Sequence, residues 1–89
     1  MQKFPLGRVV ATPHALTELE RASINPLELI GRHVSLDPGC LDAHDQALNV
    51  VAVESGNRIF SSYIYAGTKY YVISEHDRSV TTLMLASDY

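Results

Sequence analysis

The spacing of the apolar residues changes at Gly56, and this change sets the narrowest limit on the fold. Before Gly56, apolar side chains recur at intervals of three and four residues, which is typical of amphipathic helices. After it they alternate with polar ones, which is typical of half-buried strands. Helices followed by a run of strands predict an α+β protein. Its 89 residues contain no linker-like segment, so residues 1–89 are expected to form one domain.

Two proline-containing signals place the first two helices. Thr12-Pro13 and Asn25-Pro26 each join a capping side chain to a proline that suits the first helical position. We expect helices over about 13–23 and 26–34, after a short strand over 7–11. The expected inner residues are Leu16, Leu19 and either Ala22 or Ser23 in the first helix, and Leu27, Ile30 and Val34 in the second.

A third helix is expected over about 41–54. The sequence Asp37-Pro38-Gly39-Cys40 before it is typical of a tight turn. Gly56 after it suits the left-handed position that ends many helices. The expected inner stripe consists of Leu41, Leu48, Val51 and Ala52.

Three strands are predicted over 58–65, 69–74 and 80–85. Gly67-Thr68 is expected to form the first hairpin loop, and His76-Asp77-Arg78 the second turn. The predicted order is β-α-α-α-β-β-β. We expect the helices on one face of a small, mainly antiparallel sheet that ends in a three-stranded meander.

The charge distribution suggests a protein partner rather than nucleic acid. The net charge is −3, whereas nucleic-acid binders usually carry a basic face. No Lys or Arg occurs between Arg32 and Arg58. Within that interval lie four carboxylates, which form either a solvated surface or a binding surface for a basic protein. The candidate binding residues are Asp37, Asp42, Asp45 and Glu54, with Tyr63 and Tyr65 added as exposed aromatic contacts unless cross-strand packing accounts for them.

The sequence contains no recognisable catalytic or metal-binding motif. The histidines lack metal-ligand spacing and there is no glycine-rich phosphate loop, so we expect no cofactor, no metal and no enzymatic activity. One alternative is a ribonuclease, in which an imidazole moves protons and cationic groups stabilise the phosphate charge. Its candidate catalytic residues are His76, Arg78, Arg58 and Lys69.

The expected location is the cytoplasm. Cys40 is the single cysteine and cannot form an internal disulfide, so no oxidising compartment is implied. The first residues lack the apolar core of a signal peptide, and no apolar run approaches the ~20 residues of a membrane helix.

Several short motifs resemble those of a known family. They are Gly7 to Pro13, Arg32-His33, the step from Asp45 to Asn49, the run Glu75, Asp77, Arg78, Ser79, Thr81 and Thr82, and Asp88-Tyr89. This pattern resembles small bacterial proteins of plasmids and integrative elements, often labelled plasmid-related. The resemblance implies a bacterial mobile-element context and no particular activity.

Three functional hypotheses follow. The first is an acidic interaction protein that inhibits a host defence complex, as anti-CRISPR or anti-restriction proteins do. The second is an RNA-cleaving toxin or its inactive relative. It rests on the order of the elements, which is similar to that of RelE-type messenger-RNA interferases and, more loosely, of barnase-like ribonucleases. The third is a structural accessory protein that dimerises through a meander edge or its tyrosines.

Overall fold

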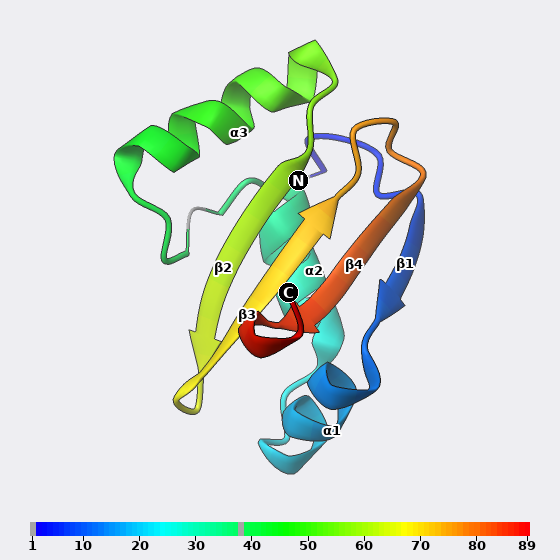
Figure 1. Ribbon diagram of the computed structural model, residues 1–89, viewed down its shortest axis with the longest axis vertical. Coiled ribbons are helices and arrows are strands. Elements are labelled where there is room, and N and C mark those ends of the chain that lie inside the picture. The colour runs from blue at the N-terminus through cyan, green and yellow to red at the C-terminus, as the bar shows by residue number, and fades with distance from the viewer. Residues whose placement is uncertain (1, 38) are drawn as a thin grey trace.

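The computed structural model describes residues 2–37 and 39–89 and confirms the α+β class and the predicted element order. Two helices lie behind a four-stranded sheet, and a third crosses one end of it (Figure 1). The elements are β1 (Arg8–Ala11), α1 (Pro13–Arg21), α2 (Pro26–Val34), α3 (Ala43–Ser55), β2 (Ile59–Tyr65), β3 (Thr68–Ser74), β4 (Val80–Leu85) and the short 3₁₀ helix η1 (Ala86–Asp88). Pro38, in the predicted turn before α3, lies outside the described residues.

The sheet has the order β1-β4-β3-β2. The strands β2, β3 and β4 form the predicted antiparallel meander, while β1 pairs in parallel with β4. The predicted loop Gly67-Thr68 is wrong by one residue, because Tyr65 pairs with Thr68. The loop is Ala66-Gly67, and both residues have positive φ, at 49° and 79°. Two positive φ angles are the signature of a type I′ turn, whose twist matches that of the strands.

Side-chain caps begin all three helices, at Thr12 and Asn25 as predicted and at Asp42, which was not predicted and places the start of α3 two residues after the expected Leu41. Thr12 accepts a hydrogen bond from the Ala15 amide, Asn25 from the Leu27 amide, and Asp42 from the Asp45 amide. Gly56 ends α3 with a φ of 80°, which confirms its predicted left-handed role. The helix boundaries are therefore fixed locally.

The predicted inner faces of α1 and α2 are partly wrong. Leu16 is 45% exposed and Leu27 is 68% exposed. Each helix is short and contacts the sheet along one narrow stripe, and successive residues are about 100° apart around a helix. An apolar residue beside the stripe therefore stays in water. The residues buried by these helices are Ala15, Leu19, Leu29, Ile30 and His33.

The predicted inner stripe of α3 is also wrong, except at Ala52. Leu48 and Val51 are 52% and 59% exposed, and the buried residues are Asn49 and Ala52. Figure 1 gives the reason: α3 runs across the end of β2 instead of lying flat on the sheet. A helix in that position contacts the protein with a small part of its surface.

The main core lies between the sheet and the first two helices. It includes the buried residues Leu19, Leu29, Tyr63, Tyr70, Val72 and Leu83. A second cluster under α3 joins Phe4, Ala52 and Ile59. Among the helices of the described chain, none combines the length and apolar character required to cross a bilayer.

Candidate functional site

Asp37, the first of the predicted acidic binding residues, is already paired. The Arg32 guanidinium donates to both of its carboxylate oxygens, at 2.9 and 3.1 Å. These hydrogen bonds lower the pKa of Asp37 and raise that of Arg32. The Asp37 charge is thus balanced within the protein and offers little to a basic partner.

The other three predicted carboxylates do not form one surface. Asp42 caps α3 and accepts from the Asp45 amide at 2.8 Å. Asp45 and Glu54 are both exposed, but they lie nine residues apart on α3. Nine residues correspond to about half a turn of net rotation, so the two carboxylates point to opposite sides of the helix. The acidic interval in the sequence is divided among separate faces in the structure.

The predicted aromatic contacts, Tyr63 and Tyr65, face the helices. Tyr63 is fully buried, and its hydroxyl donates to the Asp37 carbonyl at 3.0 Å. Burial raises the pKa of Tyr63 to about 12. The Arg32 guanidinium lies 4.2 Å from the centre of the Tyr63 ring and donates to the Tyr65 hydroxyl at 3.0 Å. This cluster joins α2 to β2, which is a structural role, and Tyr63 is inaccessible to a partner.

Arg78 is held by backbone carbonyls. Its guanidinium donates to the carbonyls of Ala52 and Asn57, both at 2.7 Å, and of Glu75 at 3.0 Å. Because the Ala52 carbonyl belongs to the last turns of α3, Arg78 connects the β3–β4 turn to the C-terminal end of that helix. Cationic groups are favoured at this end of a helix. These bonds hold the guanidinium through Nη1 and Nη2 and give Arg78 a structural role.

The four candidate ribonuclease residues do not converge. Arg58 makes an ion pair with Glu75, with Nε 3.3 Å from Oε1. Lys69 pairs in register with Ile64, six residues along the strand direction from Arg58. At ~3.3 Å per residue this is a separation of about 20 Å, far beyond the reach of groups that act on one bond. His76 is exposed in the β3–β4 turn.

A buried polar chain around His33 is a feature that the sequence reasoning missed. The Thr81 hydroxyl donates to the Leu6 carbonyl at 2.7 Å, so it must accept from the Ser74 hydroxyl at 2.6 Å. Ser74 must then accept from Nε2–H of His33, at 2.9 Å. Nδ1 of His33 is left to accept from the Ser61 hydroxyl, at 2.7 Å. The chain fixes His33 as the neutral Nε2–H tautomer, and burial lowers its pKa to about 4.

The open face of the sheet carries an aromatic cluster. Phe60 and Tyr71 have ring centres 4.6 Å apart, and the Tyr89 ring lies 6.1 Å from Phe60 and 5.7 Å from Tyr71. No helix of the described chain other than η1 lies in front of this face (Figure 1). Tyr89 is 70% exposed and Ile64, on the same side of β2 as Phe60, is 57% exposed. We call Phe60, Ile64, Tyr71 and Tyr89 the aromatic face.

This face could have been located from the strand pattern. The hairpin pairs even-numbered residues of β2 with odd-numbered residues of β3, so Phe60 and Tyr71 share a side while Tyr63 and Tyr70 share the other. The position of Tyr89 has no such signal, since it depends on how η1 folds back over β3 and β4.

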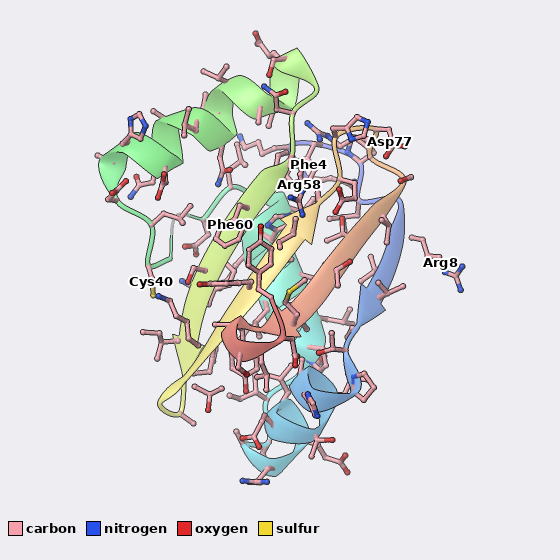
Figure 2. All side chains as sticks on the ribbon, in the orientation of Figure 1. Phe4, Arg8, Cys40, Arg58, Phe60 and Asp77 are labelled. Atoms are coloured by element: carbon pink, nitrogen blue, oxygen red, sulfur yellow. The ribbon has the colours of Figure 1, made fainter. Side chains whose placement is uncertain are left out.

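A shallow hollow of about 210 Å³ lies beside the aromatic face, between α3 and β2. Phe60 and Leu48 form its apolar part, and Asp45 and Arg58 its charged part. Figure 2 shows Phe60 on β2 and Arg58 just before that strand near this place, with Cys40 at the outer edge of β2. The hollow and the aromatic face share Phe60 and so form one continuous surface.

Within residues 2–37 and 39–89, no three His, Cys, Asp or Glu side chains gather in a way that could hold a metal ion. The chain matches no family model, no curated protein and no solved structure.

Proposed function

We propose that the protein is a non-enzymatic binding domain that recognises another protein through its aromatic face. The observation that supports this most is the cluster of Phe60, Tyr71 and Tyr89 on a sheet face that the two packing helices leave open. Aromatic residues are enriched where protein interfaces gain most of their binding free energy.

The composition of the face favours a partner with an apolar patch. Ile64 adds an exposed aliphatic side chain beside the aromatic rings. Two cations lie near this face, Arg58 and Lys69. Arg58 is paired with Glu75, and among the described residues no ion pair is formed by Lys69, at the hairpin end of β3. One such cation is a weak electrostatic basis for holding a nucleic-acid strand, whose affinity depends on several phosphate contacts. A protein partner accounts for the face better.

This proposal differs from the acidic inhibitor expected from the sequence. The inhibitor hypothesis needs Asp37, Asp42, Asp45 and Glu54 on one surface, and these carboxylates are dispersed. A bacterial mobile-element origin and a defence complex as the target stay predictions. The ribonuclease alternative lacks support from geometry, because Arg78 is held by carbonyls and Lys69 is remote from Arg58.

The test compares two variants of the tagged protein in pull-downs from bacterial cells. Ile64→Glu with Tyr89→Glu places charges on the aromatic face at exposed positions, so the fold should persist. Leu27→Glu, on the far side in α2, is the matched control because Leu27 is equally accessible. We expect one protein partner that binds the native chain and the control at both low and high salt, and that is lost with the double variant.

Other results would overturn the proposal. A partner released at high salt and by Asp45→Asn with Glu54→Gln, yet retained by the double variant, would favour the acidic inhibitor. Recovery of ribosomes or RNA would favour the ribonuclease alternative and direct mutagenesis to His76 and Arg78.

A further inference from the structure

The Asp88 carboxylate of η1 is bonded to the start of α1, although 74 residues of sequence separate Asp88 from His14. Its Oδ2 accepts from the Thr12 hydroxyl at 2.8 Å and from the Leu85 amide at 3.2 Å. Its Oδ1 accepts from Nδ1–H of His14 at 2.8 Å, since an ionised carboxylate can only accept. The side chain of Asp88 is 15% exposed, whereas that of His14 is 78% exposed. We call Thr12, His14, Leu85 and Asp88 the Asp88 clamp.

The parallel pairing of β1 with β4 brings the two halves of the clamp together. Both strands end at the same edge, where the Thr12 amide donates to the Leu83 carbonyl at 3.0 Å. The helix α1 begins directly after β1 and η1 directly after β4, so both start at this edge (Figure 1). The first turn of α1 contains no acidic residue of its own, and a helix N-terminus favours a nearby carboxylate. Asp88 supplies that carboxylate from a remote part of the sequence.

The residue after Asp88 is Tyr89, the most exposed member of the aromatic face. Its ring meets those of Phe60 and Tyr71 edge-on, at interplanar angles of 75° and 84°. Edge contacts of this kind are individually weak, and the turn bond from the Tyr89 amide to the Ala86 carbonyl is long, at 3.3 Å. The hydrogen bonds of the clamp have an ionised acceptor, which makes them stronger. The clamp is therefore the firmer attachment of this segment.

We propose that Asp88 is a positioning residue of the aromatic face, which fixes η1 to α1 and so holds the Tyr89 ring beside Phe60 and Tyr71. The segment η1 is three residues long, and a single helical turn is weakly stable without outside contacts. Loss of the Asp88 carboxylate removes both the tie to α1 and the bond to the amide that begins η1. The face then loses the fixed position of its most exposed ring.

The consequence for binding rests on the proposed function, whereas the position of the ring does not. An aromatic side chain that is already held in place loses less conformational freedom on binding than a mobile one. Loss of the clamp should therefore weaken binding through the aromatic face, although the Asp88 side chain itself is mostly buried.

NMR of the protein without a partner tests the position of the ring. We expect nuclear Overhauser effects from the Tyr89 ring to the rings of Phe60 and Tyr71 in the native chain, and their loss in Asp88→Ala. Asp77→Asn is the matched control, because the described bonds of its carboxylate lie within its own turn, and it should leave these signals unchanged. Native intensities in Asp88→Ala would overturn the proposal, as would their absence from the native chain.

His14→Ala tests the clamp from the α1 side. His14 is exposed and the Thr12 cap of α1 is retained, so this variant should fold even if Asp88→Ala does not. We expect the Tyr89 signals to fall at least twofold, while His44→Ala, at an exposed position of α3, leaves them at native intensity. Native intensities in a folded His14→Ala protein would overturn the proposal.

A double-mutant cycle tests the coupling to binding, by titration with the purified protein that the native chain captures from bacterial cells. Tyr89→Ala and Asp88→Ala should each weaken binding at least tenfold, and Asp88→Ala should cause little further loss when residue 89 is already alanine. Equal losses with and without the Tyr89 ring would overturn the positioning role in binding. Capture of no protein by the native chain would contradict the proposed function alone, because the NMR experiment needs no partner.

Discussion

Asn49 of α3 forms two hydrogen bonds with the backbone of Phe60. Its Nδ2 donates to the Phe60 carbonyl at 2.7 Å, and its Oδ1 accepts from the Phe60 amide at 3.1 Å. A side-chain amide here completes the pairing of an edge strand, which otherwise exposes unpaired donors and acceptors. One residue thus attaches α3 to the sheet and closes the upper part of the β2 edge.

Asn49→Ala should therefore loosen α3. Each buried hydrogen bond contributes about 1 kcal/mol and a buried group left unpaired costs about 1–3 kcal/mol, so we expect a loss of roughly 2–3 kcal/mol in the free energy of unfolding. Urea unfolding measures the loss, and hydrogen exchange should show faster exchange in α3 than in α2. Gln46→Ala is the control, because the exposed Gln46 bonds only locally, to Leu41. Equal effects of the two substitutions would contradict the role assigned to Asn49.

His33 should make the protein less stable in mild acid. Its pKa is about 4 in the folded protein against an ordinary value of 6.5, so the unfolded chain binds more protons between these pH values. Stability contributed by neutral His33 is complete above pH 6.5 and is lost as the pH falls toward 4. At 1.36 kcal/mol per pH unit the loss is roughly 3 kcal/mol.

Urea unfolding at several pH values between 7 and 4 measures this loss, with His44→Gln as the control at an exposed position. Asp37 and Asp88 have lowered pKa values and contribute stability that is lost mainly below pH 3.8, outside the window. A flat profile between pH 6.5 and 4 would contradict the buried neutral state of His33. Its imidazole nitrogen shifts in NMR should also show the Nε2–H tautomer at neutral pH.

Arg78→Lys should destabilise the protein although it preserves the charge. A lysine ammonium cannot reproduce the planar set of donors that contacts the carbonyls of Ala52, Asn57 and Glu75. We expect a loss of about 2–3 kcal/mol, since hydrogen bonds to charged groups are worth about 1.5–3 kcal/mol each and some are replaced by water. His76→Ala, in the same turn, should change stability by less than about 0.5 kcal/mol. An Arg78→Lys variant as stable as the native protein would contradict this structural role and make Arg78 a candidate functional residue again.

Two glycine substitutions should have opposite effects. Gly31 lies inside α2 with open space where a Cβ would project, so Gly31→Ala should stabilise the protein by about 0.5–1 kcal/mol. Gly7 has a φ of 65°, and a Cβ there would overlap the Arg78 carbonyl. Gly7→Ala should therefore destabilise by more than Gly31→Ala stabilises. Thermal unfolding of the two variants checks the signs, and a stabilising Gly7→Ala would show that the close approach of the two segments is wrong.

The local signals in the sequence determined the elements and their order. Thr12, Asn25 and Asp42 begin helices because a side chain bonds a free amide within three residues, and Gly56 ends one because it tolerates a left-handed backbone. Such interactions involve neighbours in the chain, so the caps at Thr12 and Asn25 and the role of Gly56 could be predicted without the fold, whereas the cap at Asp42 was missed and the third helix was expected two residues too early. The alternation after Gly56 likewise predicted the meander, with an error of one residue at the hairpin.

Only the tertiary structure decided which side of each element is buried and which polar groups meet. Leu27 and Val51 have the composition of core residues but lie in water, because α2 and α3 contact the sheet along narrow stripes. Arg78 donates to the Ala52 carbonyl near the end of α3, and His33 of α2 bonds with Ser61 and Ser74 of the sheet, through contacts that depend on the packing of separate elements. Burial and pairing are properties of the whole three-dimensional arrangement, whereas caps and alternation are properties of the chain.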